Sequence, residues 1–145
     1  MQGILMLPNM KKLLPPLIGI LLIGAAFYFL LKGNQKEGMQ AAVPDITISA
    51  AELFADFYED ESAANQKYLN KTIEVKGEIT DIKKGRNGMP KLMLAAKHPT
   101  FGVLCTFDAQ SEHPRQEFHP GEEVVLKCIC MDYYNNVELT NCVEK

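Results

Sequence analysis

The sequence lacks the short motifs that mark the common enzyme classes. It contains no Gly-x-Ser-x-Gly, no His-Glu-x-x-His and no glycine loop of the kind that cradles phosphates. Its acidic residues Asp108, Glu112 and Asp132 form no pair whose spacing suggests acid–base catalysis. We therefore predict that the protein is not an enzyme and that it uses no cofactor.

Cysteine is missing from the whole N-terminal part, because the first of the four cysteines is Cys105. A lipoprotein signal needs a cysteine directly after an N-terminal apolar run, so that signal is excluded. There is no Cys-x-x-Cys pair, which excludes a thioredoxin-like redox motif and the common structural zinc sites. The histidines show no ligand spacing either, and we predict no metal site; they are His98, His113 and His119.

Positive charge is scarce after the N-terminal region. From Met39 onwards the chain has 11 lysines and arginines against 17 aspartates and glutamates, a net charge of −6. An acidic domain is a poor electrostatic match for nucleic acid, and it is repelled by anionic lipid. Nucleic acid is therefore an unfavoured partner.

Charge is absent altogether from one stretch, the apolar run from Leu13 to Leu31. Its 19 residues would form a helix of about 28 Å, close to the thickness of a bilayer core of about 30 Å. A cleaved signal peptide is the alternative, but the run is long and bulky for one. We expect a single transmembrane helix at 13–31, which makes the membrane a partner. A short cytoplasmic segment at 1–12 precedes it, a flexible linker at 32–47 follows, and a domain occupies 48–145.

That domain is expected to open with a helix. Ser49 and Glu52 have the spacing of a capping box. An apolar stripe follows, and the acidic residues 59–61 predict a break, after which Ser62 could cap a second short turn. The stripe consists of Leu53, Phe54, Phe57 and Tyr58.

After Asn70 the apolar period changes from helical to two, which predicts strands. We expect five of them, at 73–82 with a bulge near its end, 92–95, 101–107, 124–133 and 137–143. Turns are predicted at 85–88 and 135–136, and a polar loop at 111–120. An all-β domain with an N-terminal helix and an irregular segment between its third and fourth strands is typical of a five-stranded Greek-key barrel of the OB type.

Three stretches of this domain carry a family resemblance. They are residues 68–79, which read YLNKTIEVKGEI, residues 103–107, which read VLCTF, and residues 121–143. With them, the chain from Ser49 onwards resembles the tRNA_anti-like OB-fold proteins, small bacterial domains of mostly unassigned function. The resemblance implies an OB fold that often follows a membrane segment. Cys128 stands where the family pattern usually has glycine.

The cysteines lie on predicted strands. Folding the last hairpin about Asn135 and Asn136 brings both Cys128 and Cys130 near the level of Cys142, and the residues alone leave the partner open. Free core thiols and a metal site are the alternatives. The resemblance implies a Cys130–Cys142 disulfide and a second bridge between Cys105 and Cys128. A disulfide would suit a domain outside the cytoplasm.

A binding surface can be predicted from the fold. OB folds bind through the face of strands two and three and through the loops after strands one and four. Cations beside aromatic rings suit a single strand or a sugar, whereas a solvated turn with packed tyrosines is the alternative. The candidate ligand-binding residues are Lys84, Arg86, Lys91, Tyr133 and Tyr134.

These features together predict a single-pass protein of the inner membrane with a periplasmic domain. We expect a binding or interaction module whose ligand is a protein or an extended polymer close to the membrane surface. A nucleic-acid-binding domain facing the cytoplasm is one alternative, and an accessory subunit with a purely structural role is another.

Overall fold

The computed structural model describes residues 24, 38–86 and 88–145. The predicted N-terminal segment at 1–12, the predicted transmembrane helix at 13–31 apart from Gly24, and the first part of the predicted linker lie outside these residues. Within the described residues, no helix combines the length and the apolar character that crossing a bilayer requires.

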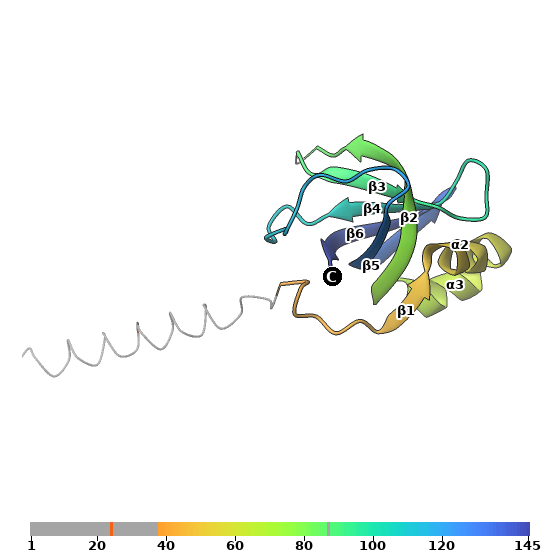
Figure 1. The fold of residues 1–145 in the computed structure, drawn as a ribbon. Coiled ribbons are helices and arrows are strands. Elements are labelled where there is room, and N and C mark those ends of the chain that lie inside the picture. Colours follow the sequence, from red (N-terminus) through yellow and green to blue (C-terminus); the bar gives the residue numbers. More distant parts are fainter. Residues whose placement is uncertain (1–23, 25–37, 87) are drawn as a thin grey trace, which may run out of the picture. The chain divides into compact units, whose positions relative to one another are not determined.

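The fold is a closed barrel of five strands, as predicted for an OB-type domain (Figure 1). The strands follow one another in the order β2-β3-β4-β6-β5, and antiparallel pairing between β2 and β5 closes the barrel. β4 and β6 are parallel. The predicted bulge is present in β2, between Ile79 and Asp81. The strands are β2 (Thr72–Lys84), β3 (Pro90–Leu94), β4 (Val103–Phe107), β5 (Glu123–Tyr134) and β6 (Asn136–Glu144).

A sixth strand, β1 (Ile46–Ser49), was not predicted. It runs parallel to β2 at the edge of the sheet, where Ile46 pairs with Ile73 and Ser49 with Lys76. Ile46 and Ile48 are partly buried against the core. With four residues, the strand is too short to show a convincing period of two in the sequence.

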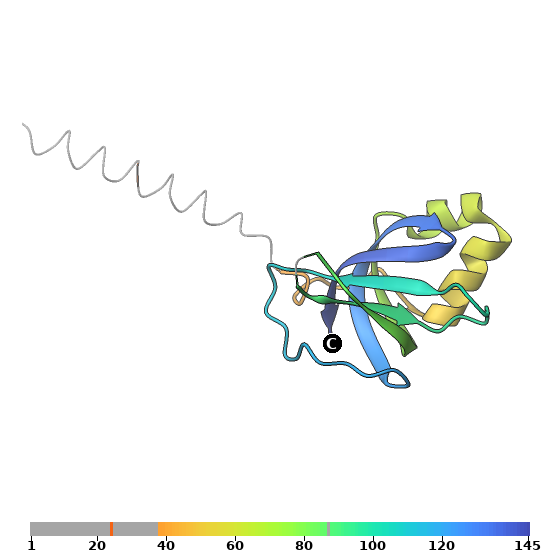
Figure 2. The same cartoon turned by 90° about the horizontal axis from the view of Figure 1, so that it is seen from above.

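Two helices, α2 (Ala50–Glu59) and α3 (Glu61–Tyr68), connect β1 to β2 and lie together at one end of the barrel (Figures 1 and 2). The predicted capping box of Ser49 and Glu52 is present. The prediction that Ser62 caps the second helix is wrong. Asp60 does so, because its backbone is extended and its carboxylate accepts the Ala63 N–H at 3.0 Å.

A disulfide is present, but it joins Cys128 to Cys142. The Cys130–Cys142 and Cys105–Cys128 pairings are wrong, since Cys105 and Cys130 are free and buried. The reason is a pair of irregularities between β5 and β6. The register shifts between Cys130 and Asp132 and shifts again between Lys127 and Ile129. Cys130 consequently faces Leu139, while the Cα atoms of Cys128 and Cys142 lie 4.2 Å apart.

The chain just before β1 is attached to the barrel. Lys127 is a largely buried residue, and its ammonium group donates hydrogen bonds to the carbonyl oxygens of Gln40 and Ala42 at 2.6 and 2.7 Å. The Gln40 side chain in turn donates to the carbonyl oxygen of Glu112 at 2.6 Å. The described end of the predicted linker is therefore held against β5 and the loop that precedes it.

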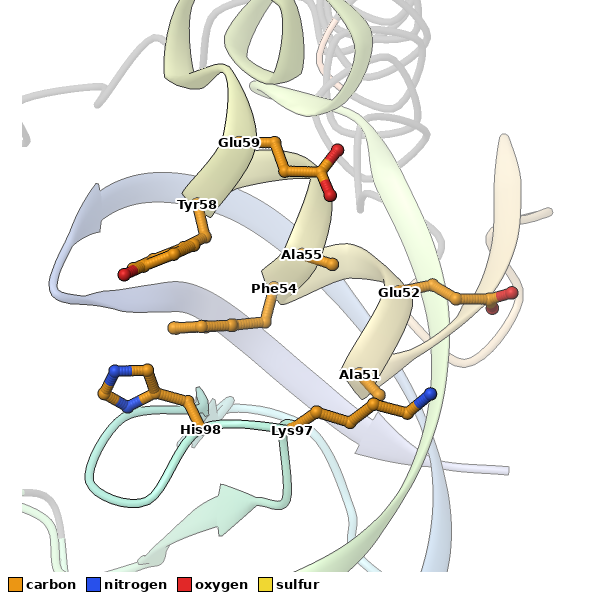
Figure 3. A pocket seen from close by; sticks show the side chains of 8 residues that line it. All are labelled: Ala51, Glu52, Phe54, Ala55, Tyr58, Glu59, Lys97 and His98. Carbon is orange, nitrogen blue, oxygen red and sulfur yellow. The ribbon is translucent and has the colours of Figure 1, made fainter.

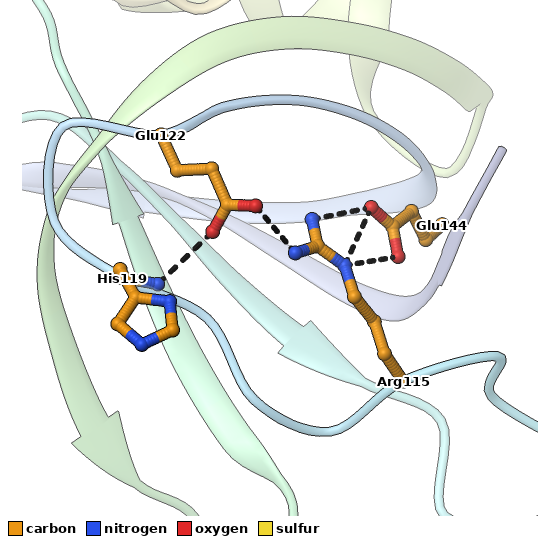
Figure 4. A network of polar contacts seen from close by, with 4 residues as sticks. All are labelled: Arg115, His119, Glu122 and Glu144. Carbon is orange, nitrogen blue, oxygen red and sulfur yellow. Dashed lines mark hydrogen bonds and ion pairs between the residues drawn. The ribbon is translucent and has the colours of Figure 1, made fainter.

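That loop, which connects β4 to β5, is held by Arg115 (Figure 4). The guanidinium donates to both carboxylate oxygens of Glu144 on β6 and also pairs with Glu122. The Glu122 carboxylate accepts the His119 N–H at 3.0 Å, and the guanidinium lies 4.5 Å from the centre of the Phe118 ring. This bidentate ion pair and cation–π contact fix an otherwise irregular segment to the end of the barrel wall.

Candidate functional site

The predicted ligand-binding residues fall into two groups. Lys84, Arg86 and Lys91 lie at the turn between β2 and β3, where Lys91 pairs with Thr106 of β4. Tyr133 pairs with Val137, which in turn pairs with Val103 at the other end of β4. Three residues of strand separate the two levels, about 10 Å along β4. The fold therefore places the cations and the tyrosines at different levels of the sheet.

Of the two tyrosines, Tyr134 is the more exposed, with 80% of its surface accessible, whereas Tyr133 is partly buried. The ring of Tyr133 stacks on Phe57 at 5.3 Å and meets the edge of Phe54 at 6.3 Å. Burial raises the pKa of the Tyr133 hydroxyl. Tyr133 thus serves to pack the β5–β6 hairpin against α2, while a binding role for the basic turn stays a prediction.

A different site lies on the outer side of α2. A hollow of about 210 Å³, which we call the α2 hollow, opens between this helix and the loop from β3 to β4 (Figure 3). The helix supplies most of its lining and the loop supplies the rest. The lining residues are Ala51, Glu52, Phe54, Ala55, Tyr58, Glu59, Lys97 and His98.

Three rings form the apolar wall of the α2 hollow. The ring centres of Phe54, Tyr58 and His98 lie 5.6 to 5.9 Å from one another. Phe54 is buried, whereas 64% of the Tyr58 surface is exposed. The Nδ1 atom of His98 accepts the N–H groups of Thr100 and Phe101, which orients the imidazole. The exposed ring of Tyr58, beside the oriented imidazole of His98, offers a surface on which a ligand group can stack.

Sequence reasoning missed this site. The helical spacing of Phe54 and Tyr58 indicated an apolar stripe, and a stripe is most often core. The exposure of Tyr58 distinguishes a binding site from a core stripe. That exposure depends on where the loop between β3 and β4 passes the helix. His98 shows no ligand spacing in the sequence, and the same loop places it beside Phe54 and Tyr58 of the helix.

The sequence from residue 6 to residue 143 matches the family model described as tRNA_anti-like. The chain belongs to the tRNA_anti-like family. The resemblance seen in the sequence is thereby confirmed, over nearly the whole chain.

One solved structure resembles this tRNA_anti-like protein. It is a crystal structure from Klebsiella pneumoniae subsp. pneumoniae described as a "putative nucleic acid-binding lipoprotein". The two chains share 17% sequence identity with a TM-score of 0.48, over 68% of this chain and 90% of the other. A comparison with curated proteins finds no match.

Carboxylates rim the α2 hollow of this tRNA_anti-like domain. Glu52 is engaged in the capping box, and its hydrogen bonds with the Ser49 side chain and backbone lower its pKa. Glu59 also lines a neighbouring hollow of about 240 Å³, next to Asp56 and Asp60. Throughout the part of the chain that the structure describes, no hydrogen bond or ion pair engages the Glu59 carboxylate. The site therefore offers one unpaired negative charge beside exposed aromatic surface.

Asp56 links α2 to α3. Its carboxylate accepts the Tyr68 hydroxyl at 2.5 Å and pairs with the Lys67 ammonium at 2.9 Å. The Tyr68 hydrogen bond, followed by that of Lys67, lowers the pKa of Asp56. These contacts hold the two helices against each other.

We expect this carboxylate to make stability depend on pH. Because its folded-state pKa is lowered, the stabilisation is complete above the ordinary pKa of about 3.9 and disappears as the pH falls through the folded-state value. Asp56→Asn should thus lower the unfolding temperature at pH 7, with the difference from wild type vanishing in strong acid. Tyr68→Phe should reproduce part of the effect. Thermal unfolding between pH 7 and pH 2 measures it, and parallel curves for wild type and Asp56→Asn would contradict it.

The described residues hold one group of sulfur atoms close enough to share a metal ion. The Sγ atoms of Cys105, Cys128 and Cys142 lie within 4.8 Å of one another, and all three residues are buried. Two of the three are joined in the disulfide, so they cannot act as thiolate ligands until that bond is reduced. The arrangement is a buried free thiol, that of Cys105, next to the Cys128–Cys142 disulfide.

Proposed function

We propose that this tRNA_anti-like protein is a non-enzymatic binding module. In this proposal the segment 13–31 anchors it in the inner membrane, the OB-fold domain faces the extracytoplasmic side, and the ligand is a protein or an extended polymer. The α2 hollow carries the proposal, because it combines exposed aromatic surface with the Glu59 carboxylate, which forms no hydrogen bond or ion pair with any residue that the structure describes. Such concave, partly apolar sites are where proteins usually bind ligands.

The disulfide supports the extracytoplasmic placement. Structural disulfides persist in oxidising compartments and are rare in the cytosol. Cys128 and Cys142 are fully buried on the neighbouring strands β5 and β6, with their Cα atoms 4.2 Å apart. Acid-quenched cells, alkylated before and after reduction, should yield this pair in its oxidised form by mass spectrometry. A pair that is reduced in intact cells would contradict the placement.

The binding role is tested by photocrosslinking of the full chain in its own membrane. Replacing Tyr58 with p-benzoylphenylalanine should give an adduct on illumination, since the exposed ring of Tyr58 lines the hollow. The same replacement at Lys84 tests the basic turn between β2 and β3, and it is the control for the replacement at Tyr58. Digestion of the adduct by a protease indicates a protein ligand, and digestion by a muramidase indicates an envelope polymer.

Three results would speak against the proposal. An adduct at Lys84 without one at Tyr58 would move the binding site to the β2–β3 turn. An adduct that nucleases remove would favour nucleic acid. The absence of any adduct at both positions would favour the accessory subunit with a purely structural role.

A further inference from the structure

We infer that the α2 hollow binds the cationic side chains of a basic polypeptide segment. The inference rests on the proposed function and specifies its ligand. It commits to a protein partner rich in arginine or lysine, and it excludes an anionic polymer at this site.

The charges around the hollow give the first argument. The residues that line the α2 hollow and its neighbour include four carboxylates, Glu52, Asp56, Glu59 and Asp60, against the two lysines Lys67 and Lys97. Lys67 is already paired with Asp56. The remaining excess of negative charge matches a cation brought in by a partner.

Glu59 has an unfavourable position that a cation would correct. It is the last residue of α2, whose final turn contains no basic residue. A carboxylate there faces the negative end of the helix dipole. A bound ammonium or guanidinium group would interact favourably both with Glu59 and with the carbonyl groups at the end of the helix. Because Glu59 lines both hollows, it stands where two ligand side chains could converge.

The aromatic wall gives an independent argument. Cations bind over the faces of aromatic rings, and the planar guanidinium group also stacks on them. Figure 3 shows Phe54, Tyr58 and His98 grouped together, with the carboxylate groups of Glu52 and Glu59 on the other side of the view. The Lys97 ammonium lies on the same side as the Glu52 carboxylate and offsets part of its charge, so the Glu59 carboxylate is the negative group left opposite the rings for a ligand side chain that enters the hollow. This combination favours a cation over a neutral or anionic group.

The test uses the full chain in nonionic detergent and a fluorescein-labelled peptide in which arginine alternates with glycine. Fluorescence anisotropy should show binding that weakens as salt rises from about 50 to about 300 mM. A peptide with citrulline at each arginine keeps the shape and removes the charge, and it should bind at least about ten-fold more weakly.

Two variants locate the site. Glu59→Gln should weaken binding of the arginine peptide about five-fold, as expected for a partly exposed ion pair, and Tyr58→Ala about ten-fold. Both side chains are exposed, so the fold should survive, which unchanged unfolding temperatures will check. Glu117→Gln removes another exposed carboxylate, from the β4–β5 loop, and should change binding less than two-fold.

The outcomes separate the inference from the function on which it rests. Equal losses in Glu59→Gln and Glu117→Gln would reveal non-specific attraction to an acidic surface and overturn the inference. Equal binding of the citrulline peptide would also overturn it. If neither peptide binds while Tyr58 still forms crosslinks in the membrane, the hollow has a ligand of different chemistry, and the proposed function stands without the inference.

Discussion

Removal of the Cys128–Cys142 disulfide is expected to lower the free energy of unfolding by about 3 kcal/mol. The bridge closes a loop of 14 residues, and a cross-link of this span restricts the unfolded chain by roughly that amount. Both cysteines are fully buried, so the double variant Cys128→Ala/Cys142→Ala also leaves a gap in the packing. Urea unfolding of the double variant and of the wild type, both oxidised, measures the difference.

Cys130→Ala is the matched control for this prediction. Cys130 is a buried free thiol on the same strand, and its loss should cost only about 1 kcal/mol of packing. Equal destabilisation in the double variant and the control would show that the bridge itself contributes nothing. Rearrangement to Cys105 should be slow in the folded protein, because burial raises the pKa of the Cys105 thiol and suppresses the reactive thiolate.

Gly102→Ala is expected to destabilise the fold by about 3 kcal/mol. A Cβ atom at this position would lie 2.3 Å from the carbonyl oxygen of Leu94, a backbone atom that cannot move without the strand. The N–H of Gly102 is also bonded to the Asn136 side chain, and its carbonyl oxygen accepts the Val137 N–H. The substitution must therefore separate β3 from β4 or detach the start of β4 from β6. Urea unfolding measures the loss.

The same variant should also weaken binding at the α2 hollow, because Gly102 closes the loop that carries Lys97 and His98. Gly38→Ala is the control, since the nearest atom to its added Cβ is the Ser111 hydroxyl oxygen at 4.0 Å. Gly38→Ala should change the free energy of unfolding by less than about 0.5 kcal/mol. A Gly102→Ala protein as stable as this control would mean that the two strands do not approach as closely as the structure indicates.

The barrel could be predicted because its strands have one buried face. Ile73 and Val75 of β2 are completely buried, as are Leu92 and Leu94 of β3, and this alternation is visible in the sequence. β1 could not be predicted, because four residues at a sheet edge carry too little of the pattern. The strand order follows from the OB topology, once five strands of this kind are recognised.

The disulfide shows where such prediction ends. Its partners depend on two register shifts in β5–β6, and one of them lies beside Asn141, whose φ is 51°. Asparagine tolerates this left-handed backbone conformation, but nothing in the neighbouring residues requires it there. A one-residue shift decides which cysteine faces Cys142.

Predicting the candidate site requires long-range contacts even more than predicting the disulfide does. The basic turn and the two tyrosines looked adjacent because both flank the usual OB binding face. The lengths of β2 and β5 placed them at different levels of β4 instead. The α2 hollow brings residues 51–59 together with residues 97 and 98, and only the closed barrel creates that proximity.

The hydrogen bonds from Lys127 to the backbone of Gln40 and Ala42 affect how the domain would respond to a pulling force. β1 is a short edge strand in parallel pairing with β2, and tension applied at its N-terminal side could strip it from the sheet. Because the ammonium holds the chain upstream of β1, such tension is transmitted first to β5, a central strand paired on both sides. We therefore expect the Lys127 hydrogen bonds to bear a force applied to the upstream chain before it reaches the edge strand β1.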